Sequence, residues 1–187
     1  VHEVKKDNLR IIRGLEENVA EAYDHEDMSL QDLLNILEIS TRQFLGKQRA
    51  DIRLECHCQS DFSVREHYRL LSILKNLVTN AVEAIQAGKG QGVVRVETKT
   101  DGEDFLLLVS DNGPGIPPRA IKMLFQVGYS TKFNAATGDI NRGVGLPAVH
   151  YIVEELGGSI QVESQLKQGT VFQVRLPLSA IAGGDRT

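Results

Sequence analysis

The sequence predicts an α/β fold of the α+β kind: a two-layer sandwich with a mixed, mostly antiparallel sheet of about five strands and helices on one face. One reason is the order of the apolar patterns, in which single helices interrupt pairs of strands. Another is that short glycine-containing turns join two of these pairs, as in antiparallel neighbours. The 187 residues, 41% hydrophobic and 25% charged, also have the composition of a globular domain.

An N-terminal helix is predicted over residues 3–24, where apolar residues recur at steps of three and four that are close to a heptad seam. Such a seam predicts a dimer formed through a helical bundle. After a charged break, Ser29 is a candidate N-cap for a second helix, with Asp32 as its partner in a capping box. We expect Gly46 to end this second helix.

The chain then alternates between strands and helices. Residues 51–58 show the strict alternation of a strand, and residues 64–87 form a long helical pattern rich in Leu and Ile. Pro147 suits the first turn of a further helix, which Gly157 is expected to end. The other predicted strands are residues 93–98, 105–110, 159–164 and 170–176.

One long segment fits neither pattern. Residues 111–145 are polar and contain six of the 17 glycines of the chain. Loops of this length inside a compact domain are uncommon, and they are usually functional or disordered. We therefore expect functional residues in this segment.

Charge and apolar content argue against several classes of protein. A net charge of −4 speaks against a nucleic-acid binder held by bulk charge. No apolar run reaches the roughly 20 residues of a membrane-spanning helix, and no secretory signal pattern opens the chain. Two cysteines favour a reducing, cytoplasmic setting. Because the chain opens with Val-His and has no initiator Met, we expect a fragment of a longer protein.

Two asparagines lie on the helix predicted over 64–87. Asn76 and Asn80 are four residues apart and therefore share one helix face. Asn is a poor helix former, and its amide oxygen is a hard, neutral ligand that suits Mg²⁺. The alternative is that both side chains form hydrogen bonds with a neighbouring loop.

The segment after the strand 105–110 reads Asp111-Asn-Gly113-Pro-Gly115-Ile116. An Asp at a strand end can accept a hydrogen bond from an exocyclic amine, and the glycines allow the backbone to approach a flat ligand closely. A tight surface turn is the alternative.

Two further motifs suit phosphate groups. Ser130, Thr131 and Lys132 offer two hydroxyls and a cation beside Tyr129. The run Arg142-Gly143-Val144-Gly145-Leu146 directly precedes a helix, and glycine-rich turns that enter a helix N-terminus expose backbone N–H groups to anions.

Together these motifs occur in the order Asn-x-x-x-Asn-Ala, Asp-x-Gly-x-Gly, Phe-x-x-Gly-Tyr-Ser-Thr-Lys, Gly-x-Gly-Leu and Gly-Thr-Val-Phe at 169–172. This order resembles the ATP-binding catalytic domain of sensor histidine kinases, in the gyrase/Hsp90/histidine kinase/MutL ATPase superfamily. The resemblance implies the Bergerat-type ATP-binding fold. It also implies a dimerisation helix or its remnant over 1–28, an ATP-binding catalytic domain over 29–178 and a flexible tail over 179–187.

The resemblance also implies roles for single residues. Asn80 would hold Mg²⁺ and Asn76 would lie near the phosphates of ATP or ADP. Asp111 would bind the adenine amine, with Gly113 and Gly115 lining the base and Ile116 beside them. The other implied nucleotide-binding residues are Tyr129, Ser130, Thr131 and Lys132 in a lid, Arg142, Gly143, Val144, Gly145 and Leu146 at the phosphates, and Thr170 near the adenine.

The sequence departs from the family pattern at Pro147, which replaces the last glycine of the Gly-x-Gly-Leu-Gly motif. Pro in the first turn of a helix costs little, because no N–H partner is needed there. We expect ATP binding to survive with one backbone donor fewer.

Position 76 separates two chemistries within the superfamily. The gyrase, Hsp90 and MutL branches would carry a Glu there to polarise water, whereas an amide cannot act as a general base. Asn76 therefore favours a two-component protein-histidine kinase whose partner is the receiver domain of a response regulator. The alternatives are an ATP-hydrolysing relative, an anti-sigma-type serine kinase of the same fold, and a non-catalytic nucleotide-binding scaffold.

Among the five histidines, His2 is the candidate phosphoacceptor, because His2-Glu-Val-Lys resembles the start of a kinase dimerisation helix. Residues 8–15 are also similar to the Spo0B-like dimerisation helices of citrate- and fumarate-type sensors. The competing interpretation is that 3–24 is the second helix of a hairpin whose phosphoacceptor helix lies upstream. Whether the full-length protein also carries a membrane anchor stays open. His57 lies between two cysteines, but strand alternation directs it away from both, which argues against a zinc site.

Overall fold

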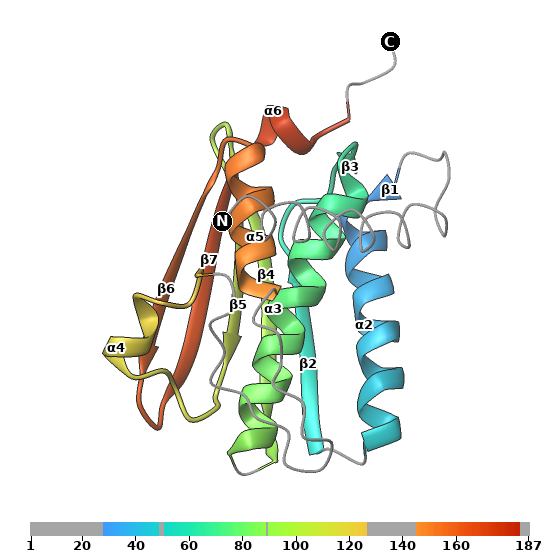
Figure 1. Cartoon of the computed structure of the whole chain (residues 1–187). Coiled ribbons are helices and arrows are strands. Elements are labelled where there is room, and N and C mark those ends of the chain that lie inside the picture. Colours follow the sequence, from blue (N-terminus) through green and yellow to red (C-terminus); the bar gives the residue numbers. More distant parts are fainter. Residues whose placement is uncertain (1–27, 49–50, 89, 127–144, 184–187) are drawn as a thin grey trace, which may run out of the picture.

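A computed structural model describes residues 28–48, 51–88, 90–126 and 145–183 of the chain. The predicted helix over 3–24, with its expected dimer seam and His2, lies outside these residues. Within them the chain forms one layer of strands and one layer of helices, and the two layers pack face to face (Figure 1).

The sheet has five strands in the order β2-β4-β5-β7-β6. The edge strand β2 runs parallel to β4, and the other three neighbouring pairs are antiparallel. This arrangement confirms the mixed, mostly antiparallel sheet. The strands are β2 (Asp51–Cys58), β4 (Gln91–Asp101), β5 (Asp104–Asp111), β6 (Ser159–Gln165) and β7 (Gly169–Pro177).

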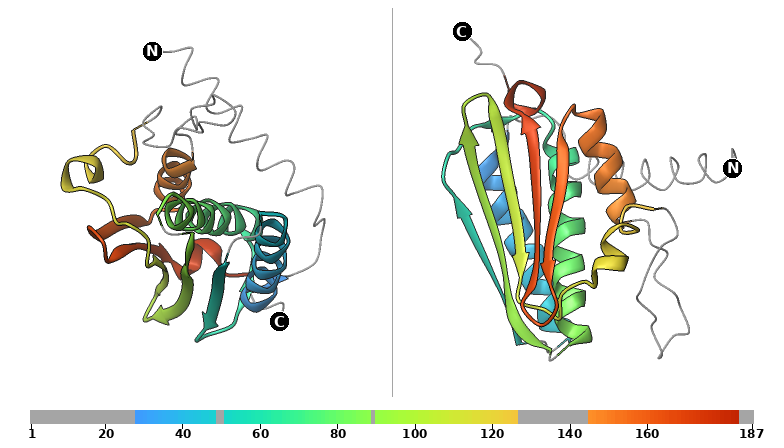
Figure 2. Two further views of the ribbon diagram at one scale, coloured as in Figure 1. Left: turned by 90° about the horizontal axis from the view of Figure 1, so that it is seen from below. Right: turned by 90° about the vertical axis from the view of Figure 1, so that its left-hand side faces the viewer.

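Three helices cover the same face of the sheet, α2 (Leu30–Gln48), α3 (His67–Ala87) and α5 (Gly145–Glu155), as both views in Figure 2 show. The one-sided placement of the helices is therefore as predicted. The short helix α4 (Pro118–Ile121) lies beside this layer, and α6 (Leu178–Ile181) follows β7. No helix of the described residues is long and apolar enough to span a membrane.

The central helix α3 forms the middle of the core. Its apolar side chains meet the inward faces of β4 and β5, and α2 and α5 close the core on either side. Leu74 and Leu77 on α3 and Phe105 and Leu107 on β5 have no measurable solvent exposure. Burial of each such side chain contributes about 1.5–3 kcal/mol, so the contact between α3 and β5 is a large part of the stability of the domain.

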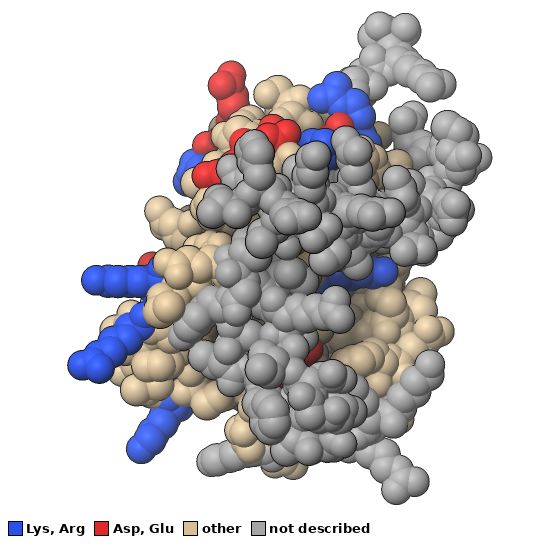
Figure 3. Space-filling model, in the orientation of Figure 1, with Lys and Arg blue, Asp and Glu red and all other residues tan. Residues whose placement is uncertain are grey.

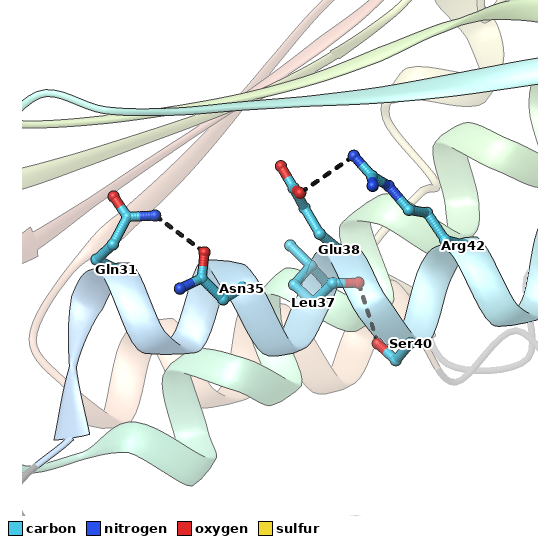
Figure 4. A network of polar contacts seen from close by, with 6 residues as sticks. All are labelled: Gln31, Asn35, Leu37, Glu38, Ser40 and Arg42. Carbon is cyan, nitrogen blue, oxygen red and sulfur yellow. Dashed lines mark hydrogen bonds and ion pairs between the residues drawn. The ribbon is translucent and has the colours of Figure 1, made fainter.

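The start of α2 confirms the predicted capping box. The N–H of Asp32 donates to Oγ of Ser29 at 3.1 Å, and the N–H of Ser29 donates to Oδ2 of Asp32 at 3.4 Å. Polar contacts within one turn then continue along the helix (Figure 4): Gln31 donates to Asn35, Ser40 donates to the carbonyl of Leu37, and Arg42 pairs with Glu38.

The structure corrects the predicted start of the helix over 64–87. The helix α3 begins at His67, because Ser63–Val64 forms a short strand, β3, that pairs with β1 (Met28–Ser29). Val64 is 1% exposed and also bridges to Ala182 near the end of the chain. The strand-like backbone at 63–64 is thus stabilised by residues far away in the sequence.

Four other predictions differ in detail. The second helix was expected to end at Gly46, but α2 continues to Gln48. The segment 111–145 was predicted as loop throughout, but it contains α4 within its described part. The helix expected from Pro147 begins at Gly145, which leaves Pro147 within the first turn, where its missing N–H costs little. The first part of the tail expected over 179–187 is instead structured, because residues 178–181 form α6 and Ile181 is fully buried; residues 184–187 lie outside the described ranges.

The cysteine strand keeps the predicted alternation. Cys56 and Cys58 are half-buried and pack against the core, whereas His57 between them is exposed. Burial, followed by the charge of Glu38 and a hydrogen bond with it, raises the pKa of Cys56 to about 12. This thiol should stay protonated and unreactive at neutral pH, because the thiolate is the nucleophile.

Alkylation of Cys56 should therefore be slow in the folded protein. In a Cys58→Ser background, labelling by iodoacetamide at pH 9.0, which equals the ordinary pKa of a thiol, should be at least about tenfold slower in the folded than in the denatured chain.

Because folding raises the pKa of Cys56, the free energy of unfolding that is linked to this thiol is fully present below pH 9.0 and is lost as the pH rises toward 12. Glu38→Gln should speed labelling only in part, since burial remains; equal rates in folded and denatured chains would contradict this environment.

Candidate functional site

A row of four residues crosses the sheet at the end of β5. Asp111 pairs with Val94 of β4 and with Thr170 of β7, and Thr170 pairs with Ser164 of β6. Directly opposed residues project to the same face of a sheet. Buried core residues precede Asp111 at two-residue steps along β5, so the row lies on the helix-covered face.

The loop after β5 approaches the end of α3. Oδ1 of Asp111 accepts a hydrogen bond of 2.8 Å from the N–H of Gly113, which folds the loop back on the strand. A Cβ added at Gly113 would lie 2.8 Å from that oxygen and 3.4 Å from the backbone of Ala84 and Ile85. Glycine therefore lets the loop pass between Asp111 and α3.

The β6–β7 hairpin contacts the same loop from the other side. The N–H of Lys167 donates to the carbonyl of Pro114 at 2.8 Å. Gly115 has φ of +74°, and a Cβ there would overlap the carbonyl oxygen of Gln165. Gly169 has φ of +120°, and a Cβ there would overlap the carbonyl oxygen of Asp111. Backbone thus meets backbone at both glycines.

Ser164 joins the loop to both strands of the hairpin, and none of the sequence motifs indicated this residue. Its Oγ lies 2.8 Å from the N–H of Ile116, 3.0 Å from the carbonyl of Gly169 and 2.8 Å from Oγ1 of Thr170. One signal was available, because Ser164 continues the inward alternation of Ile160 and Val162 along β6 as a polar residue.

The two asparagines of α3 are half-buried, one turn apart on the predicted shared face. Nδ2 of Asn76 donates to the carbonyl of Ser72 at 2.9 Å, which holds the amide along the helix. A Cβ added at Gly145 would lie 3.0 Å from Oδ1 of Asn76, so the N-terminus of α5 meets α3 at this amide. The N-terminus of a helix favours anions.

The site therefore has two ends along α3. Gly113 contacts the helix at Ala84, and Gly145 contacts it at Asn76, eight residues earlier. At 1.5 Å per residue the two contacts are about 12 Å apart along the helix axis. Asn80 lies between them. One end carries a carboxylate and the other a helix N-terminus, so an elongated ligand with a hydrogen-bond donor and an anionic group suits this stretch.

The described residues bring together the part of the predicted site that contains Asp111, Gly113, Gly115, Thr170, Asn76 and Gly145. Ile116 and Leu146 are partly buried and pack against the core. Figure 3 shows basic side chains along one edge of the helical face, with acidic and basic ones mixed at its upper end. Outside the described residues lie Tyr129, Ser130, Thr131, Lys132, Arg142, Gly143 and Val144.

The donor set suits a magnesium ion better than a transition metal. The described ranges hold no cluster of three or more His, Cys, Asp or Glu side chains that could bind a metal. Asn76 instead provides a neutral amide oxygen beside the helix N-terminus, and Asn80 carries a second amide one turn along α3. Mg²⁺ is typically held by few protein oxygens together with phosphate oxygens and water, and these amides fit that pattern.

The model of the histidine kinase-, DNA gyrase B- and HSP90-like ATPase family matches residues 66–180. Sensor histidine kinase GlnK of Bacillus subtilis is 34% identical over 95% of the chain, and sensor protein CitS of Halalkalibacterium halodurans is 35% identical over 75%. The chain spans 42% of the length of GlnK and 25% of that of CitS.

Solved structures show the same fold. The catalytic domain of histidine kinase ThkA superposes with a TM-score of 0.64 at 24% identity, over 82% of this chain and 96% of that domain. Full-length ShkA in complex with AMPPNP superposes with a TM-score of 0.69 at 23% identity, over 85% of this chain and 31% of ShkA.

The steric role of Gly115 can be tested against a matched glycine. Gly102, in the turn between β4 and β5, has φ of +60° and open space where a Cβ would stand. Gly102→Ala should cost about 1 kcal/mol in urea unfolding, from the left-handed backbone alone. Gly115→Ala should cost about 3 kcal/mol or more, because its Cβ also meets the backbone of Gln165. Equal losses would contradict the close contact.

Proposed function

The chain belongs to the histidine kinase-, DNA gyrase B- and HSP90-like ATPase family, and on this basis we propose that it is the ATP-binding catalytic region of a two-component sensor histidine kinase. The observation that carries the proposal is that the loop held by Asp111 and the N-terminus of α5 contact α3 at points about 12 Å apart along the helix axis. An extended nucleoside triphosphate has a comparable length and the matching polarity.

At the base end, Asp111 would accept a hydrogen bond from the exocyclic amine of adenine. Gly113 and Gly115 would let the base lie against the backbone, with Ile116 and Thr170 beside it. At the other end, Gly145 and Leu146 open α5, whose backbone N–H groups would face the phosphates. Tyr129, Ser130, Thr131, Lys132, Arg142, Gly143 and Val144 are proposed to complete the phosphate contacts on the strength of the family motifs.

Asn80 is the proposed magnesium ligand, with Asn76 beside the phosphates. Bound Mg²⁺ would supply charge neutralisation between the phosphate groups. The contribution of the chain is to hold two neutral amides on one face of α3, where the bond from Asn76 to the carbonyl of Ser72 limits rotation of the side chain.

Asn76 also supports transfer to a protein group over hydrolysis. A carboxylate at this position could take a proton from water, whereas an amide cannot, so water would stay a weak nucleophile. The γ-phosphoryl would pass to a histidine nitrogen, with ADP as the leaving group, and then to an aspartate of a response-regulator receiver domain. His2 is the proposed acceptor in a dimer formed through the helix predicted over 3–24, in a cytoplasmic setting.

Nucleotide binding is tested by thermal unfolding. ATP with Mg²⁺ should raise the melting temperature of the 187-residue chain, by the equivalent of about 2.7 kcal/mol at a hundredfold excess over the dissociation constant. Asp111→Asn and Asn80→Asp should abolish the shift. Asp104→Asn, at the opposite end of β5, removes only the exposed ion pair with Arg175 and should retain it. Retained affinity in Asp111→Asn would refute the adenine assignment.

The type of transfer is tested by the chemistry of the product. Labelling of the full-length protein by γ-labelled ATP should give an acid-labile phosphohistidine, whereas the serine-kinase alternative gives an acid-stable product and the ATPase alternative gives free phosphate. We expect weak or no labelling of residues 1–187 alone. Strong labelling that His2→Ala removes would assign the acceptor to His2 and overturn that expectation.

A further inference from the structure

We propose that Ser164 of β6 determines the selectivity of the site for adenine over guanine, by fixing which way the hydroxyl of Thr170 points its hydrogen. Ser164 is thus a positioning residue that acts through Thr170. This inference rests on the proposed binding of ATP, and it concerns which base the same site accepts.

The hydroxyl of Ser164 has one hydrogen and two lone pairs, and it has three neighbours within bonding distance. The N–H of Ile116, at 2.8 Å, can only donate, and the carbonyl of Gly169, at 3.0 Å, can only accept. All three contacts can be made at the same time only if the single hydrogen of Ser164 goes to Gly169. The remaining contact, 2.8 Å to Oγ1 of Thr170, is satisfied only when Thr170 donates.

This arrangement leaves Thr170 with lone pairs alone for any ligand. Thr170 stands directly opposite Asp111 in the register of β5 and β7, and the carboxylate of Asp111 is also an acceptor. The sheet therefore presents two hydrogen-bond acceptors side by side. Adenine carries an amine at its six-position, which donates to such a pair. Guanine carries a carbonyl there, which both acceptors repel.

The surrounding backbone keeps Ser164 in place. The bond from Lys167 to Pro114 and the close contact of Gly115 with Gln165 hold the hairpin against the loop directly before Ile116. Thr170 is 4% exposed, so solvent has little access to take the place of Ser164 as its acceptor. Removal of the Ser164 hydroxyl would free the Thr170 hydrogen to turn toward the ligand, where it could donate to the guanine carbonyl.

The test measures dissociation constants for ATP and GTP by calorimetry, with Mg²⁺ present. Ser164→Ala should lower the GTP-to-ATP ratio of dissociation constants by about tenfold, because it weakens ATP binding and removes one repulsive acceptor for GTP. Ser164→Thr, which keeps the hydroxyl, should retain the wild-type ratio of dissociation constants. Ser159→Ala, at the exposed start of β6, is the matched control and should change nothing.

A double-mutant cycle shows whether the effect passes through Thr170. In a Thr170→Val background, Ser164→Ala should leave the ratio unchanged, since no hydroxyl remains to be oriented. A loss of affinity by the same factor for both nucleotides, or an effect that persists in Thr170→Val, would overturn the proposal. If Ser164→Ala does not fold, Ser164→Cys, whose thiol bonds weakly, is read in the same way.

The wild-type chain separates this proposal from the one on which it rests. Binding of neither nucleotide by the wild-type chain would overturn both proposals. Binding of ATP over GTP by the wild-type chain, with an unchanged ratio in Ser164→Ala, would overturn only the role of Ser164 and leave the proposed function standing.

Discussion

The packing of α3 against the sheet is the constraint on which the rest of the domain depends. Ten residues of this helix are buried, because the sheet lies behind it and α2 and α5 flank it. A helix that is apolar around most of its circumference has only a narrow face left for polar side chains. Asn76 and Asn80 occupy that face. The same contact therefore stabilises the fold and places both amides toward the site.

Close backbone contacts shape the other half of the site. The loop after β5 contacts α3 at Gly113 and the β6–β7 hairpin at Gly115. The backbone of the hairpin also contacts that of Asp111 at Gly169. Side chains at these points would meet carbonyl oxygens or helix backbone, so the absence of a Cβ is what permits the approach. The site is consequently bounded by main chain on two sides, where geometry varies less than among side chains.

Polar groups at the base end form a connected set. Asp111 bonds to the loop through Gly113, Ser164 bonds to the loop through Ile116, and Ser164 also reaches Thr170 across the hairpin. Each bond in such a half-buried set restricts the direction of the next, because a hydroxyl has a single hydrogen to donate. The acceptor character of the site is therefore a property of the whole set and not of one residue.

Local patterns in the sequence were sufficient for the five strands of the main sheet, the capping box at Ser29 and the order of the motifs, because alternation, caps and glycine turns act over a few residues. They could not reveal that Ser63–Val64 leaves the helix to pair with β1, or that Ser164 meets Ile116, 48 residues earlier. The parallel pairing of β2 with β4 belongs to the same class. The tertiary structure alone decided these features, because they depend on hydrogen bonds between segments far apart in the chain.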